Sequence, residues 1–152
     1  MAMAAKPVIL LVNGPNLGLL GERNPAVYGR TTLADIEADV AALVNEAGGA
    51  LLAFQSNNEG AVIDFLHEHR KRAHGAIVNA GGWTHTSVAL RDAIEASELP
   101  VVEVHISNTH AREAFRHVSL ISAVCVGQVT GLGRDSYTVA TRLLLQKLRQ
   151  SS

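Results

Sequence analysis

The stretch VILLVNGPNLGLLGERNPAVYG, residues 8–29, decides how this chain folds. Its first five residues are all apolar and three of them are β-branched, a pattern typical of a strand that is buried on both faces. The loop after this strand runs for about nineteen residues, which is longer than most structureless connections within a compact domain. We therefore predict a lid over the end of the strand, with Arg23 and Tyr28 carried in a frame of Gly, Pro and Asn residues.

The bulk composition indicates a single domain that binds a small molecule. The chain has 152 residues, of which 47% are hydrophobic and 18% charged, so we predict one domain over residues 1–152 with flexible termini at 1–6 and 150–152. The formal net charge of −1 argues against nucleic acid and membrane surfaces as partners. No apolar run approaches the roughly twenty residues that span a bilayer. The N-terminal residues show no signal peptide, so we expect a cytoplasmic protein.

Apolar runs alternate with segments of helical periodicity along the rest of the chain. The predicted strands are 8–12, 51–55, 76–78, 101–104 and 123–126. The predicted helices are a segment that starts after a Thr32–Asp35 cap and stops at Gly48, a segment through 62–69, a segment of about 86–96, a shorter piece at 111–117 and a last helix at 135–150. This alternation predicts an α/β, flavodoxin-like three-layer fold, in which a five-stranded parallel sheet of order 2-1-3-4-5 carries helices on both faces.

Polar residues follow four of the predicted strands. In parallel sheets of this kind, ligands bind in the crevice outside the carboxyl ends of the strands. The residues at those ends are Asn13, Asn16, Gln55 to Asn57, Asn79, and His105 to Asn108. Amides, hydroxyls and an imidazole therefore meet at one edge, which predicts a polar, oxygen-rich ligand.

The sequence argues against three other kinds of chemistry. The seven histidines form no HExxH motif and the single Cys125 belongs to an apolar run, so we predict no metal site, no internal disulfide and an inert buried thiol. No phosphate-binding GxxxxGKS/T loop and no GxGxxG loop follows the first strand, which argues against a nucleotide site. The three lysines lie at a strand start and towards helix ends, which argues against a Schiff base.

Tyr28, Arg23 and His105 support acid–base chemistry better. A tyrosine has an unperturbed pKa of about 10, so a tyrosine base needs a neighbouring group that stabilises its phenolate. A guanidinium about 4 Å away supplies roughly 4 kcal/mol at an effective dielectric constant of about 20, before desolvation is subtracted. His105 stands at a strand end, where an acid–base group and a structural histidine are equally good interpretations. A mobile loop that carries Arg23 and Tyr28 would couple base activation to closure over the substrate.

Four sequence blocks resemble those of the type II 3-dehydroquinate dehydratases. They are NGPNLGLLGERNPAVYG at 13–29, QSNNEG at 55–60, NAGGWTHTSVALRDA at 79–93 and VEVHISNTHAREAFR at 102–116. The resemblance is collinear from Val8 to about Leu148, and four such specific blocks in order are not expected by chance. Gly18 and Trp83 stand where many family members carry other residues, so either residue is expected to alter the lid or the pocket wall.

The resemblance assigns roles to ten residues of this sequence. It implies that the catalytic residues are Tyr28 as the base at C2, Arg23 as the cation that favours the ionised phenol, His105 as the acid for the C1 hydroxyl, and Asn16 as the holder of a water at the enolate oxygen. It implies that the substrate-binding residues are Asn79, His85, Asp92, Ile106, Ser107 and Arg116. Glu103 is expected to orient a partner on its strand, and Arg112 is expected near the site. From the residues alone, Asp92 could instead cap or pair on its helix, and His85 could be a structural N-cap.

The implied activity is the cofactor-free dehydration of 3-dehydroquinate to 3-dehydroshikimate, by anti elimination of water through an enolate, in the shikimate pathway of aromatic amino acid biosynthesis. The implied assembly is a dodecamer of four trimers, in which Asp92 reaches the site of a neighbouring subunit. The competing interpretation is a flavodoxin-like module that binds a flavin or a phosphorylated ligand at the same strand ends. With one Trp and two Tyr residues in the chain, few aromatic side chains are present to enclose a flavin, so the sequence favours the dehydratase.

Overall fold

Five parallel strands form the central sheet of the computed structural model, which describes residues 6–151. Their order is β2-β1-β3-β4-β5, which confirms the predicted topology. The strands are β1 (Val8–Asn13), β2 (Ala50–Gln55), β3 (Gly75–Asn79), β4 (Val101–His105) and β5 (Gly127–Thr130). The central position of β1, between β2 and β3, explains why its apolar run is uninterrupted.

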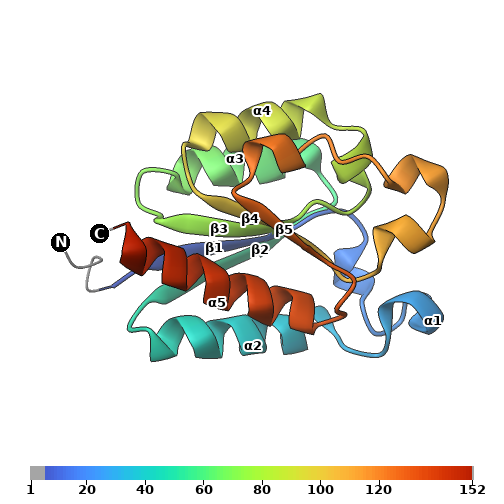
Figure 1. Ribbon diagram of the computed structural model, residues 1–152, viewed down its shortest axis with the longest axis horizontal. Helices are drawn as coiled ribbons and strands as arrows, with labels where there is room; N and C mark the ends of the chain where they lie inside the picture. Colours follow the sequence, from blue (N-terminus) through green and yellow to red (C-terminus); the bar gives the residue numbers. More distant parts are fainter. Residues whose placement is uncertain (1–5, 152) are drawn as a thin grey trace.

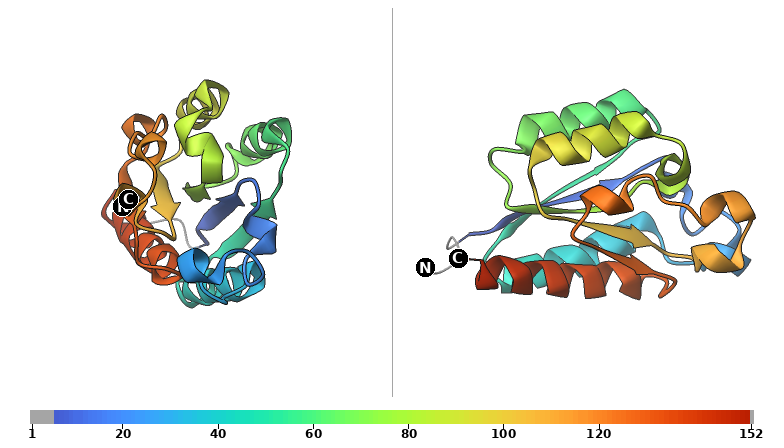
Figure 2. Two further views of the ribbon diagram at one scale, coloured as in Figure 1. Left: turned by 90° about the vertical axis from the view of Figure 1, so that its right-hand side faces the viewer. Right: turned by 45° about the horizontal axis from the view of Figure 1, so that its top comes forward.

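Helices cover both faces of this sheet (Figure 1). The longer helices are α2 (Leu33–Glu46) and α5 (Asp135–Gln150) on one face, and α3 (Glu59–His69) and α4 (Val88–Ser97) on the other. A view along the strands shows the sheet between the two helical layers (Figure 2). All five strands end on the side away from the described chain termini, where the short helix α1 (Pro25–Tyr28) also lies.

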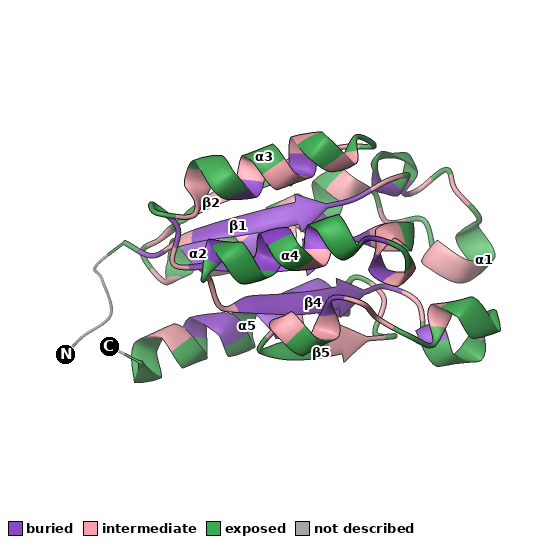
Figure 3. Ribbon diagram, turned by 90° about the horizontal axis from the view of Figure 1, so that it is seen from above, coloured by how far each residue is buried: buried purple, intermediate pink, exposed green. Residues whose placement is uncertain are grey.

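Alternation along β1 explains the two hydrophobic cores. Ile9 and Leu11 face α2 and α5, whereas Leu10 and Val12 face α3 and α4, because successive side chains of a strand point to opposite faces. All four side chains are almost completely buried. Burial follows the same pattern throughout, with buried central strands and exposed outer helix faces (Figure 3). Burying a side chain of this size contributes about 1.5–3 kcal/mol.

The N-terminus of α2 has the cap that the sequence predicts. The Thr32 hydroxyl accepts a hydrogen bond from the Asp35 backbone N–H at 3.1 Å, and the Asp35 carboxylate accepts one from the Thr32 N–H at 3.0 Å. Hydrogen bonding of the Asp35 carboxylate first to the Thr32 backbone and then to the Thr32 side chain lowers the pKa of Asp35 below its usual value. Near the C-terminal end of the chain, α5 includes Gln150. The prediction of flexible chain ends cannot be compared for residues 1–5 and 152, which lie outside the described residues.

The predicted strand at 123–126 is wrong. Residues Ser122–Val124 form a 3₁₀ helix, η5, and the last strand is the next segment, β5. The apolar run misleads because Val124 and Cys125 pack against the α3/α4 core as a loop, while β5 is an edge strand with two exposed residues. The Cys125 thiol agrees with the prediction of an inert group, since burial, followed by the charge of Glu103, raises its pKa to about 12.

Two other segments are more finely divided than the sequence predicts. In place of a helix over 111–117 there are two 3₁₀ helices, η3 (Thr109–Ala111) and η4 (Ala114–Arg116). The helix predicted at about 86–96 begins at Val88, after the 3₁₀ helix η2 (Gly81–His85). The lid contains η1 (Leu17–Leu19) and α1. No helix among residues 6–151 has the length and apolar composition needed to cross a membrane.

Candidate active site

A cavity of about 170 Å³ opens at the carboxyl ends of β1, β3 and β4. Every predicted site residue except Asp92 lines it. The lining residues are Pro15, Asn16, Leu17, Arg23, Tyr28, Asn79, Gly81, Gly82, His85, His105, Ile106, Ser107, Thr109, Arg112 and Arg116. The edge of the sheet that the sequence identifies as polar is therefore the edge with the cavity.

The lid delivers Tyr28 to this cavity at the end of α1. Pro25 occupies the first turn of this helix, where its missing N–H costs nothing, and Gly29 ends it with a φ of 74°. The half-buried ring of Tyr28 packs against the α2/α5 core. The Arg23 guanidinium carbon lies 4.3 Å from the centre of the same ring, close enough for a cation–π contact. Arg23 thus holds the ring.

The hydroxyl of Tyr28 is bound by a different arginine. Arg112 Nη1 donates hydrogen bonds to the Tyr28 hydroxyl at 2.9 Å and to the Ser107 hydroxyl at 3.2 Å. Arg112 follows η3, so this contact joins the lid to the loop after β4. From the sequence, Tyr28 is expected to pair with Arg23, and Arg112 is expected only near the site. Neither pattern nor spacing could show which guanidinium meets the hydroxyl, because the two arginines lie in segments far apart in sequence.

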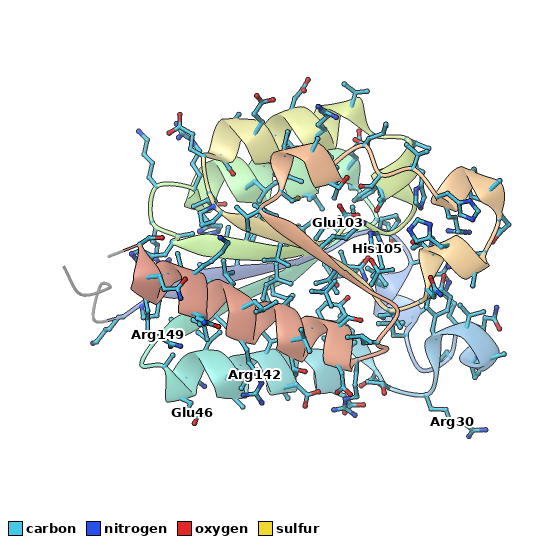
Figure 4. The ribbon with its side chains drawn as sticks, in the orientation of Figure 1. Arg30, Glu46, Glu103, His105, Arg142 and Arg149 are labelled. Atoms are coloured by element: carbon cyan, nitrogen blue, oxygen red, sulfur yellow. The ribbon has the colours of Figure 1, made fainter. Side chains whose placement is uncertain are left out.

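His105 and Glu103 form a buried pair on β4. Residues two apart on a strand share a face, and His105 Nε2 lies 2.5 Å from Glu103 Oε2. The Glu103 carboxylate is completely buried and His105 is 6% exposed. Figure 4 shows the two side chains together at the end of the sheet. The carboxylate contacts the ring at Nε2 and so fixes the orientation of the imidazole.

Behind the cavity, three buried side chains form a network that the sequence analysis missed. The Tyr137 hydroxyl, on α5, donates to Asn13 Oδ1 at 2.6 Å and accepts from Asn79 Nδ2 at 2.8 Å. Asn79 Oδ1 in turn accepts a hydrogen bond from the Gly81 N–H at 3.1 Å. Burial raises the pKa of Tyr137, so its hydroxyl remains a donor. The network fixes Asn79, which lines the cavity.

The loop after β1 brings Asn16 to the cavity. Asn16 has a φ of 68°, and its backbone N–H donates to Asn57 Oδ1 at 2.9 Å. This loop passes very close to the one after β3, since a Cβ on Gly14 would lie 2.6 Å from the Ala80 carbonyl oxygen. Only glycine permits this approach without a shift of the backbone.

Of the two departures from the family pattern, Gly18 lies in the lid and Trp83 lies beside the cavity. A Cβ on Gly18 would come 3.1 Å from Gln55 Oε1, so a larger residue there requires the Gln55 side chain to move. Trp83 packs against the α3/α4 core rather than lining the cavity.

The rim of the cavity is formed by η2 and η4. His85 Nδ1 lies 2.8 Å from the Val118 carbonyl oxygen, and Arg116 Nε donates to Glu113 Oε1 at 3.1 Å. Backbone hydrogen bonding at Glu113, followed by the bond from Arg116, lowers the pKa of the Glu113 carboxyl. Asp92 is exposed on α4 and does not line the cavity of its own chain.

The arrangement suits proton transfer on an anionic, oxygen-rich molecule. A phenol and two imidazoles line one cavity together with three guanidinium groups and two side-chain amides. Such a site can remove one proton, supply another and stabilise negative charge between the two events. Within residues 6–151, no group of three or more His, Cys, Asp or Glu side chains is placed to hold a metal ion.

Comparison with known proteins assigns the family. A 3-dehydroquinate dehydratase of Janthinobacterium sp. is 55% identical over 141 residues, covering 92% of this chain and 97% of the relative. One of Jannaschia sp. is 52% identical over 144 residues, covering 95% and 97%. The crystal structure of type II dehydroquinase from Butyrivibrio crossotus is 37% identical, with a TM-score of 0.89 over 93% of this chain and 99% of that chain. The family model for class II dehydroquinase matches residues 7–145, and the chain belongs to this family.

Proposed function

We propose that this chain catalyses the dehydration of 3-dehydroquinate to 3-dehydroshikimate, in the shikimate pathway, by anti elimination through an enolate. The observation that carries the proposal is the shared cavity of Tyr28 and His105, with Arg112 on the phenol and Glu103 on the imidazole. The names of the relatives support the same reaction. The proposed steps use side chains and backbone groups of this protein together with one water molecule.

Tyr28 is the base in the first step. Its phenolate takes the proton from C2 of the substrate, and the electrons of the broken C–H bond move to the C3 carbonyl, which becomes an enolate. Arg112 donates to the phenol oxygen and Arg23 covers the ring, so two positive charges lie against the base. Asn16 orients a water towards the enolate oxygen, and this dipole stabilises the charge that develops there.

His105 is the acid in the second step. The enolate electrons form the C1–C2 double bond as the C1–O bond breaks, and the leaving hydroxyl takes a proton from the imidazolium and departs as water. The adjacent Glu103 carboxylate contacts Nε2 and holds the imidazole in place for this proton transfer. Remaining contacts orient the substrate: backbone amides of Ile106 and Ser107 bind its carboxylate, while side chains of Asn79, His85 and Arg116 bind its hydroxyls.

The test is a direct assay with 3-dehydroquinate, without added metal or cofactor. The conjugated enone product absorbs in the near ultraviolet, so turnover appears as rising absorbance. Activity that survives borohydride treatment in the presence of substrate would show that no lysine Schiff base is used. An absence of absorbance change with folded protein would contradict the proposed function.

Replacing Arg112 by alanine is expected to lower kcat/KM by about tenfold to a hundredfold. A hydrogen bond to a charged group contributes about 1.5–3 kcal/mol, and each 1.4 kcal/mol corresponds to about a tenfold change. Steady-state kinetics measure the effect. The matched control is Arg134→Ala, which removes an arginine that pairs with Asp39 at 2.8 Å outside the cavity. Equal effects of the two substitutions would rule out the proposed role of Arg112.

Asp92 completes the site from a neighbouring subunit of a dodecamer in this proposal. Two observations support this: Asp92 is exposed on α4 and does not line the cavity of its own chain, and His85 and Arg116, which do line it, are only half-buried. When Asp92→Ala and Tyr28→Phe subunits are dissociated and reassembled together, we expect turnover above the sum of the two separate variants, because some mixed sites regain both residues. If the reassembled mixture is no more active than the sum of the two separate variants, the shared site is contradicted. Light scattering measures the size of the assembly.

A further inference from the structure

The buried carboxylate of Glu103 receives hydrogen bonds from two residues besides His105. Ser119 Oγ lies 3.0 Å from both carboxylate oxygens, and Gln128 Nε2 donates to Oε2 at 2.9 Å. Gln128 stands directly opposite Glu103 in the β4–β5 register, so the sheet itself sets this contact. Gln128 belongs to the edge strand and much of its surface is exposed, yet its amide reaches a side chain that has no exposed surface.

The direction of these hydrogen bonds determines the form of Glu103. The backbone N–H groups of Ile121 and Ser122 donate to Ser119 Oγ at 3.3 and 3.1 Å, so its lone pairs are occupied and its proton goes to Glu103. The Gln128 amide nitrogen can only donate. A carboxyl group that accepts from both is favoured as the ionised carboxylate. The proton between Glu103 and His105 therefore belongs to Nε2 of the imidazole, which leaves Nδ1 as the nitrogen that exchanges a proton with substrate.

We infer that Gln128 is a positioning residue that acts through Glu103 to set which nitrogen of His105 carries the reactive proton. The inference rests on the proposed function for its kinetic consequence, but the protonation of His105 is measurable without turnover. Loss of the Gln128 amide makes Glu103 a stronger proton acceptor and draws the shared proton away from Nε2. The imidazole then donates a proton less readily, so the step that expels the hydroxyl becomes slower.

The decisive variant is Gln128→Leu, which keeps the approximate size of the side chain but removes the donor. Gln128, Ser119 and His105 line a second polar cavity of about 130 Å³. Leucine is preferable to alanine because the smaller alanine would leave space beside Glu103 that water from this cavity can fill. We expect kcat to fall about tenfold with KM within about twofold, as for loss of one charged hydrogen bond. Gln128→Glu, which puts a second carboxylate beside Glu103, is expected to lower kcat further. The matched control, Gln146→Leu on the exposed surface of α5, leaves kcat unchanged.

Nitrogen-15 NMR of the His105 ring separates this role from a structural one. In the unmodified protein we expect Nε2 to show the chemical shift of a protonated nitrogen, and in Gln128→Leu we expect it to move towards the unprotonated value. A wild-type kcat in folded Gln128→Leu would overturn the inference, and so would a lower kcat with an unchanged His105 spectrum. If the unmodified protein does not dehydrate 3-dehydroquinate, the proposed function fails, while the NMR comparison still decides the inference.

Discussion

Turnover of 3-dehydroquinate is expected to fall by about 10²- to 10⁴-fold when Tyr28 is replaced by phenylalanine, the range associated with loss of a general base. The phenylalanine ring keeps the contact with Arg23 and the packing against the α2/α5 core, and it lacks only the oxygen that receives the C2 proton. We therefore expect substrate affinity to change little, and the loss to appear in kcat.

Steady-state kinetics and calorimetric titration with 3-dehydroquinate measure the two quantities separately. A wild-type kcat in Tyr28→Phe would remove the base from the proposed mechanism. A loss of substrate binding with an unchanged kcat would instead assign Tyr28 to substrate binding.

Replacing Tyr137 by phenylalanine is expected to have its largest effect on stability, lowering the free energy of unfolding by about 2–4 kcal/mol. Its hydroxyl donates to Asn13 and accepts from Asn79, and all three residues are at most 3% exposed. Phenylalanine leaves two buried amides without these partners, and each buried polar group left unpaired costs about 1–3 kcal/mol. Asn79 also lines the cavity, so a smaller loss of activity should accompany the loss of stability.

Urea denaturation at matched protein concentration measures this effect, because assembly would otherwise change the apparent stability. Tyr28→Phe is the matched control, since the same atom is deleted from a half-buried tyrosine, and its free energy of unfolding should fall less, because the partly exposed Arg112 keeps its hydrogen bond to Ser107. Equal stabilities for the two variants would contradict the importance of the buried network. The pair separates the two tyrosines, one needed mainly for turnover and the other mainly for the fold.

Most of the fold could be predicted because its signals are local. The apolar run at 8–12, the Thr32–Asp35 cap and the alternation of strands with helices led to the observed sheet order. The strand at 123–126 was misplaced because hydrophobicity indicates burial and not backbone pairing. Val124 and Cys125 are partly buried against the α3/α4 core without strand pairing, whereas the true edge strand is too exposed to show a hydrophobic pattern.

The sequence by itself determined the alternation of strands and helices, the polar edge and the family, and the resemblance named nine of the residues that line the cavity. Only the tertiary structure decided which side chains touch at the site and behind it: Arg112 meets the Tyr28 hydroxyl, Tyr137 joins Asn13 to Asn79, and Gln128 reaches Glu103. The physical reason is that strand and helix periodicity are properties of neighbouring residues, whereas these hydrogen bonds join residues far apart in the chain. Such contacts depend on the packing of whole elements, and a single sequence carries no periodic signal for them.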